Sequence, residues 1–192
     1  GEYQKSYDKS QEAADSIDKT TIELFYRLMN LRINKAKSDA EKSINEINQL
    51  GASKDNQFKA KYEEAIRYFN EGNNSIDSLP SDENMAQNEE EFIVASNDFN
   101  TVYLSYSNAL ASANTVKEGY LTRERTIATK TVADAKAKYN AALNAKTLTS
   151  GDANGKAITD YLNKADEALK NDNFASVQQN VAAALAALSK AE

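Results

Sequence analysis

Pro80 is the only proline in this 192-residue chain, and only six glycines accompany it. These two residue types are the strongest interrupters of a helix, so most of the chain carries no signal that would end one. Alanine, lysine, glutamate, asparagine, glutamine and serine dominate the composition. We therefore expect long helices and almost no β-strand.

The first helix is predicted from Ser10 to Leu50, with Gly51 as its stop signal. Its apolar residues recur every three or four positions, as one face of a helix requires: Ile17, Ile22, Phe25, Met29, Ile33, Ala36, Ala40, Ile44 and Ile47. At about 1.5 Å per residue this helix would be about 60 Å long.

A second, shorter helix is predicted after Ser53 and Asp55, both good N-cap types, and it should end at Pro80. The apolar stripe of this segment consists of Phe58, Tyr62, Ala65, Phe69, Ile76 and Leu79. Gly72 and Asn73 stand where the stripe calls for a larger side chain, so we expect the helix to thin or fray there.

A third helix is predicted after the SLPSDEN stretch, with Ser81 or Asp82 as its N-cap and acidic residues in its first turns. Its stripe alternates without a break: Phe92, Ala95, Phe99, Val102, Tyr106, Ala109, Ala113, Val116 and Tyr120. Such a stripe is typical of a helix packed in a bundle, so we interpret residues 99–120 as core. In the alternative interpretation the tyrosine hydroxyls, Ser105, Ser107 and Ser112 are ligand contacts.

The apolar stripe changes phase beyond Tyr120, next to Gly119. A shifted set follows it, made of Ala128, Val132, Ala135, Tyr139 and Ala142. Either one long helix continues through this point or one helix ends and another begins. Residues 148–156 are predicted as a loop, followed by a helical hairpin with its turn at residues 170–173. The apolar residues of the hairpin are Ile158, Tyr161, Leu162, Ala165, Leu169, Phe174, Val177, Val181, Leu185 and Leu188.

Charge and aromatic content divide the chain near residue 120. Residues 1–120 hold 13 basic and 21 acidic side chains and thirteen of the sixteen Tyr and Phe residues, whereas residues 121–192 hold 10 basic and 8 acidic ones. We therefore predict an all-α fold, an elongated antiparallel helical bundle in which two three-helix modules are joined by a long or kinked central helix. Residues 1–120 form the first module, and residues 121–192 form a smaller, Ala-rich one. The third helix should run parallel to the first and the second antiparallel to both.

The absence of histidine and cysteine limits the chemistry of the chain. It removes Ser-His and Cys-His nucleophiles, the usual zinc and haem ligands, and disulfides. A formal net charge of −6 without a basic stripe argues against binding to nucleic acid. We expect no enzymatic activity, no cofactor and no resident metal.

Two charged regions are candidate sites. No basic residue lies between Arg67 and Lys117, where eight acidic residues lie: Glu71, Asp77, Asp82, Glu83, Glu89, Glu90, Glu91 and Asp98. Calcium prefers such oxygen ligands, but the spacing does not match an EF-hand, and a solvated, dipole-matched helix start explains the cluster better. Arg123 and Arg125, at the phase change, are candidate contacts for a ligand or anion, against the simpler alternative of pairing with Glu118 or Glu124. Arg27 and Arg32 invite the same hypothesis.

The chain opens at Gly1 without an initiator Met, and no apolar run approaches 18 residues. We expect a removed signal or anchor and hence an extracytoplasmic location, with membrane attachment only through an anchor outside this sequence. Two functions follow as hypotheses. The first is a cell-surface module for protein interaction or structural spacing, whose partner is a protein; the second is the ligand-binding sensory domain of a membrane receptor.

Overall fold

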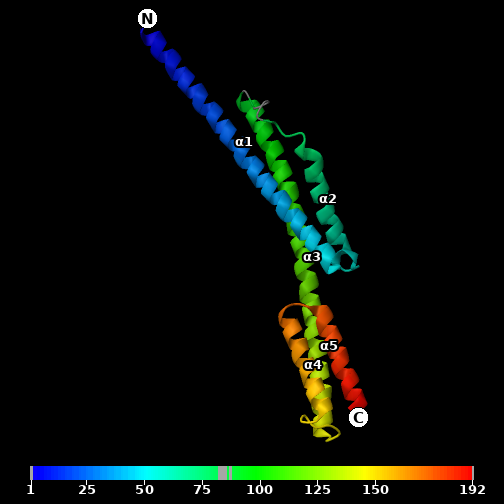
Figure 1. Cartoon of the computed structure of the whole chain (residues 1–192). Coiled ribbons are helices and arrows are strands. Elements are labelled where there is room, and N and C mark those ends of the chain that lie inside the picture. The colour runs from blue at the N-terminus through cyan, green and yellow to red at the C-terminus, as the bar shows by residue number, and fades with distance from the viewer. Residues whose placement is uncertain (1, 82–85, 87, 192) are drawn as a thin grey trace. The chain divides into compact units, whose positions relative to one another are not determined.

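The computed structural model describes residues 2–81, 86 and 88–191, and the side chains of all these residues except 2, 3 and 13–17. These described residues form five α-helices and one short 3-10 helix: α1 (Glu2–Leu50), η1 (Ala52–Lys54), α2 (Lys59–Ile76), α3 (Glu89–Asn144), α4 (Ala153–Lys170) and α5 (Phe174–Ala191) (Figure 1). No strand occurs within the described ranges. The prediction of an all-α helical bundle is confirmed.

The phase change after Tyr120 does not end a helix, because α3 continues from Glu89 to Asn144 with Gly119 inside it. The chain forms two compact units, Gly1–Lys117 and Glu118–Glu192. Both predicted stripes of α3 are buried. The stripe from Ala95 to Val116 lies in the first unit and the set from Ala128 to Ala142 in the second, whereas Phe92 and Tyr120, the ends of the first stripe, are only partly buried. Whether each predicted module folds by itself stays a prediction.

In the first unit, α1 and α3 run parallel. Contacting pairs advance together along the two helices: Phe25 with Phe92, Tyr26 with Phe99, Arg32 with Tyr103, Ser43 with Asn114, and Glu46 with Lys117. α2 is antiparallel to both, because Tyr62 near its start donates to Asn48 near the end of α1, whereas Asn73 near its end reaches Tyr106. The predicted directions of the three helices are therefore found.

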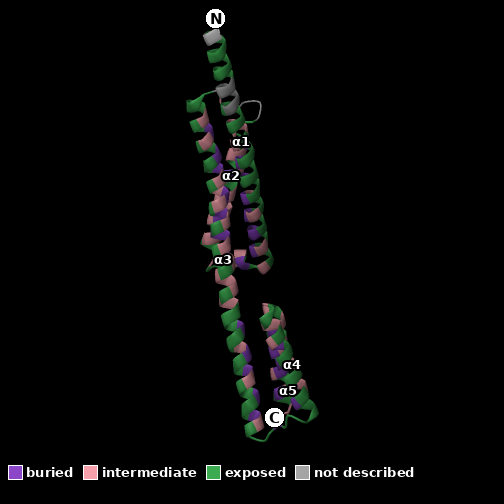
Figure 2. Cartoon of the chain, turned by 90° about the vertical axis from the view of Figure 1, so that its left-hand side faces the viewer, coloured by how far each residue is buried: buried purple, intermediate pink, exposed green. Residues whose placement is uncertain are grey.

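The buried stripe of α1 agrees with the prediction from Met29 to Ile47, whereas Ile22 and Phe25 lie at its edge. Tyr26 was not predicted, yet its side chain is only 1% exposed. Tyr26 stands three residues before Met29 and seven before Ile33, a spacing that places it on the same face of the helix. The side chain of Ile17 lies outside the described residues. Figure 2 shows the buried positions along the sides of α1, α2 and α3 that face one another.

The expectation that α2 frays at Gly72 is wrong. The helix continues to Ile76, and Gly72 is buried against the ring of Tyr106. A Cβ atom at residue 72 would lie 2.8 Å from ring atoms of Tyr106, and the Tyr106 hydroxyl donates to Asn73 Oδ1 (2.9 Å). The Tyr106 ring therefore occupies the space that a side chain at residue 72 would need.

The ends of α2 and α3 also differ from the prediction. Asp55 accepts a hydrogen bond from the backbone of Gln57, so it stabilises the turn before α2 and not the helix itself, which begins at Lys59. α3 begins at Glu89, and Asn88 caps it by accepting from Glu91 N (2.9 Å). Ser81 is exposed and outside any helix, and Asp82 lies outside the described residues. Gly51 ends α1 as predicted, with a left-handed φ of 77°.

The second unit packs the last part of α3 against the α4–α5 hairpin around Val132, Tyr139, Ile158, Val177 and Val181. The turn at residues 170–173 is found as predicted, with Asp172 at a positive φ of 53°. The predicted loop at 148–156 is displaced toward the N-terminus, since α3 ends at Asn144 and residues 145–152 connect it to α4. Leu148 is buried, and α4 already begins at Ala153 because Asp152 caps it through Gly155 N (2.6 Å).

Candidate functional site

The tyrosine- and serine-containing stretch 99–120 contributes to the core. Phe99, Tyr106 and Val116 are fully buried, and Ser112 is buried among the helices. The hydroxyl of Ser105 donates to the carbonyl of Thr101 in its own helix. Burial raises the pKa of Tyr106, so its hydroxyl stays neutral and serves the hydrogen bond to Asn73. The structure thus uses these side chains for packing.

Arg123 and Arg125 both have carboxylate partners within the second unit. Arg123 donates to Glu124 (2.8 Å), the partner that the simpler alternative named, and its guanidinium lies 5.2 Å from the ring centre of Tyr120. Arg125 forms a two-pronged contact with Asp172 (2.9 and 2.5 Å) and lowers the pKa of that carboxyl group. Sequence reasoning missed Asp172 because it lies 47 residues away. The contact joins α3 to the α4–α5 turn, and the hypothesis of an anion site gains no support from it.

Of the other two arginines considered, Arg32 lies over the Tyr103 ring, with 4.5 Å between the guanidinium carbon and the ring centre. A hydrogen bond from Arg32 lowers the pKa of the Tyr103 hydroxyl, and Ser107 adds to the effect. Arg27 is exposed on the other side of α1. These two side chains do not converge on one ligand position.

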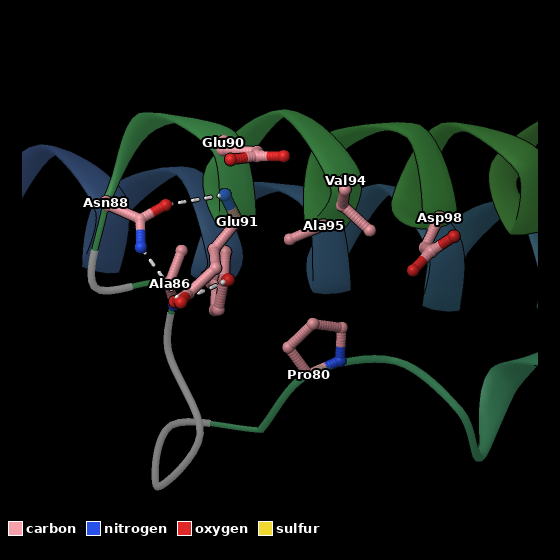
Figure 3. Close-up of a pocket in the computed structure, with 9 residues that line it drawn as sticks. Pro80, Ala86, Asn88, Glu90, Glu91, Val94, Ala95 and Asp98 are labelled. Carbon is pink, nitrogen blue, oxygen red and sulfur yellow. Dashed lines mark hydrogen bonds between the residues drawn. The ribbon is translucent and has the colours of Figure 1, made fainter.

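The acidic start of α3 borders a pocket of about 490 Å³ (Figure 3). Its lining includes Glu90, Glu91 and Asp98. Glu91 accepts from the side chain of Asn88 (2.9 Å), and Asp98 follows Glu90 by two turns, so the carboxylates are spread along the helix. Among the described residues no group of three acidic side chains is placed to hold a metal ion. Asp82 and Glu83 of the same cluster lie outside the described residues.

The outer face of α1 carries a second apolar stripe. Leu24, Leu28 and Leu31 are 61%, 55% and 68% exposed, although their spacing of four and three is as regular as that of the buried stripe. At about 100° per residue, the three leucines cluster roughly opposite Tyr26, Met29 and Ile33, which face α3. We call Leu24, Leu28 and Leu31 the leucine stripe. Sequence reasoning missed it because it followed a single apolar face of this helix.

The leucine stripe has no counterpart of equal density on α3. There the large exposed apolar side chains of the first unit are Ile93, Val94 and Leu104, and Leu104 stands more than two turns from the other two. Scattered exposed apolar residues are ordinary, whereas three at heptad spacing on one face are typical of a helix that binds another helix.

Much of the described part of α1 before the leucine stripe is also exposed. Residues 4–12 and 18–21 are exposed along this helix, and Figure 1 shows its first turns extending beyond the start of α3. An isolated helix gains no packing energy, and its stability in water is marginal. The leucine stripe and this segment together form the candidate binding surface.

No helix within the described residues has the length and apolar content needed to cross a membrane. Comparison with protein families, with curated proteins and with solved structures finds no match.

Proposed function

We propose that this chain is a non-enzymatic protein-interaction module that binds its partner through the leucine stripe of α1. The exposure of Leu24, Leu28 and Leu31 at heptad spacing is the observation that carries the proposal. An extracytoplasmic, cell-surface setting, as expected above, is part of it. Localisation of the native protein by cell fractionation tests that setting, and recovery in the cytoplasm alone would contradict it.

Burial of a leucine side chain stabilises a complex by roughly 1.5 to 3 kcal/mol relative to leaving it in water. Three such side chains in one row provide the apolar centre that a helix-binding surface needs. Polar and basic residues flank them, including Arg27 and Lys35, as expected at the rim of a protein interface. The arrangement supports binding of an amphipathic helix along α1.

Photo-crosslinking of the full chain in its native cells tests this proposal. A benzophenone amino acid at position 28 should produce a discrete covalent adduct with a protein. The matched control is the same substitution at Leu104, an exposed leucine on α3 of the same unit. Absence of any adduct at position 28 beyond that seen at 104 would contradict the proposed surface.

For the sensory-domain alternative, the pocket beside Tyr26 with its carboxylates Glu90, Glu91 and Asp98 is the candidate ligand site. Their negative charge disfavours organic acids and favours a cationic amine. Thermal-shift screening with amines, amino acids and organic acids separates the two functions, because a ligand that binds the folded chain specifically raises the Tm as its concentration increases. A Tm rise with an amine, lost in Asp98→Asn, would favour the sensory function.

A further inference from the structure

We propose that the partner of the leucine stripe is a second copy of this chain, whose α1 pairs antiparallel with the first α1 about a two-fold axis that crosses the leucine stripe midway between Leu24 and Leu28. This inference rests on the proposed function, since it names the partner of the same surface. It follows from the register of the leucines, the charge along α1 and the exposure of its first turns.

The register places leucines opposite leucines. With the axis midway between Leu24 and Leu28, Leu24 of one copy lies beside Leu28 of the other, and the symmetry repeats this contact. Leu31 then lies beside Thr21, which is exposed on the same helix. Lys35 continues the same face one turn beyond Leu31, and its aliphatic stem can cover apolar neighbours while its ammonium reaches water. An apolar centre with a polar surround results.

The charge along α1 selects the antiparallel direction. Residues 10–23 contain four acidic side chains and one basic one, whereas residues 29–42 contain four basic and two acidic ones. The antiparallel register lays the first stretch of each copy along the second stretch of the other, so that opposite net charges adjoin. It brings Asp18 close to Arg32 of the second copy. A parallel pair would instead align stretches of like charge.

The exposed start of α1 gains a neighbour in the same arrangement. Residues 10–21 of one copy run beside residues 31–42 of the other, which the bundle of that copy holds in place through Ile33, Ala36 and Ala40. A marginal helix is stabilised when a fixed helix packs along it. Dimer formation should therefore increase the helicity and the amide protection of residues 4–21.

Sedimentation velocity of the full chain tests the proposal. Between about 1 and about 200 µM, a range that suits a weak homodimer, the mass should rise from 21.1 kDa toward twice that value. Leu28→Glu should weaken the association by at least about tenfold, because it places two carboxylates at the centre of the interface. Leu104→Glu is the matched control and should leave the association unchanged. Circular dichroism melts check that both variants are folded.

The cysteine-free sequence allows a direct test of direction. Ser10→Cys and Lys42→Cys chains, mixed and mildly oxidised, should form the mixed disulfide in preference to either disulfide between identical chains. A parallel dimer would form the two symmetric disulfides instead, and that result would overturn the proposed arrangement. Hydrogen exchange should show that residues 4–21 become protected as the concentration rises, in wild type but not in Leu28→Glu.

A chain that stays monomeric over the whole concentration range would overturn the dimer. If the crosslink at position 28 then joins a different protein, the proposed interaction function stands and only its partner is wrong. If no protein adduct forms either, both proposals fail. Binding of the monomer to anionic phosphatidylserine vesicles, abolished by Leu28→Glu, would assign the leucine stripe to a lipid surface and would likewise overturn the dimer.

Discussion

Replacing Phe99 with alanine should remove the centre of the first unit's core. The Phe99 side chain is 0% exposed, and its ring centre lies 5.0 Å from that of Tyr26 and 6.0 Å from that of Phe25. These three rings come from α1 and α3, so the substitution weakens the contact between the two parallel helices. A cavity would be left between them, because the surrounding backbone belongs to long, regular helices that cannot close around it.

The expected cost is about 3 to 5 kcal/mol, the usual range for truncating a buried phenylalanine to alanine. The edge-to-face contact with Phe25 and the tilted contact with Tyr26 place the value in the upper half of that range, since each aromatic pair adds roughly 0.5 to 1.5 kcal/mol. A domain of this size has a total stability of about 5 to 15 kcal/mol. The variant should therefore remain folded in water, with much of the first unit's stability lost.

Urea denaturation followed by far-ultraviolet circular dichroism measures the loss. Hydrogen exchange on peptides of α2 and α4 assigns each transition to the first or the second unit, because each of these helices lies within one unit. Leu104→Ala is the matched control on the same helix and, with its side chain 46% exposed, should change stability by less than about 1 kcal/mol. A loss below about 1 kcal/mol for Phe99→Ala would refute the assigned core.

Three further predictions concern local features. Gly72→Ala should destabilise the first unit by about 1 to 2 kcal/mol in urea denaturation, because the new methyl group meets the Tyr106 ring. Helix propensity alone predicts a gain in stability, so a stabilised variant would contradict the contact between Gly72 and Tyr106. Asp152→Ala should lower the Tm of the second unit by roughly 4 to 8 °C at neutral pH, whereas Asp152→Asn should retain the cap. Hydrogen bonds from Gly155 and Thr149 hold the pKa of Asp152 below its ordinary 3.8. The difference in Tm between wild type and Asp152→Ala should therefore be complete above pH 3.8 and should shrink as the pH falls below it. A Tm difference that stays unchanged in acid would contradict this cap. A fragment ending at Tyr120 should stay helical and cooperative in circular dichroism, while residues 121–192 alone should be marginal, and an unfolded 1–120 fragment would contradict two separate modules.

The fold class follows from the sequence, because helix period and the scarcity of breakers act over short distances. The stripe from Ala95 to Val116 and the shifted set from Ala128 to Ala142 are buried as predicted, since a side chain three or four residues from another shares its face in any α-helix. The antiparallel hairpin of α4 and α5 follows from its short turn in the same way. The lack of histidine and cysteine is likewise a property of composition, which no tertiary arrangement can alter.

Contacts between residues distant in the chain depend on the tertiary structure. From the sequence alone, Gly72 is predicted to weaken its helix, whereas in the structure Tyr106, 34 positions later, packs against it. Asp172 becomes the partner of Arg125 only when the α4–α5 turn lies beside α3. The choice between two local caps also could not be predicted: Ser81 and Asn88 are both good capping residue types, and in the structure Asn88 caps α3.

The two apolar stripes of α1 show most clearly what the sequence alone cannot predict. Tyr26, Met29 and Ile33 repeat along the helix as regularly as Leu24, Leu28 and Leu31, so the period predicts an apolar face without saying which one is buried. α2 and α3 cover one side of α1, and the aromatic residues Phe92 and Phe99 on α3 match Phe25 and Tyr26 in size and position. That match buries the first stripe and leaves the leucines in water, because two neighbouring helices cannot enclose all sides of a third.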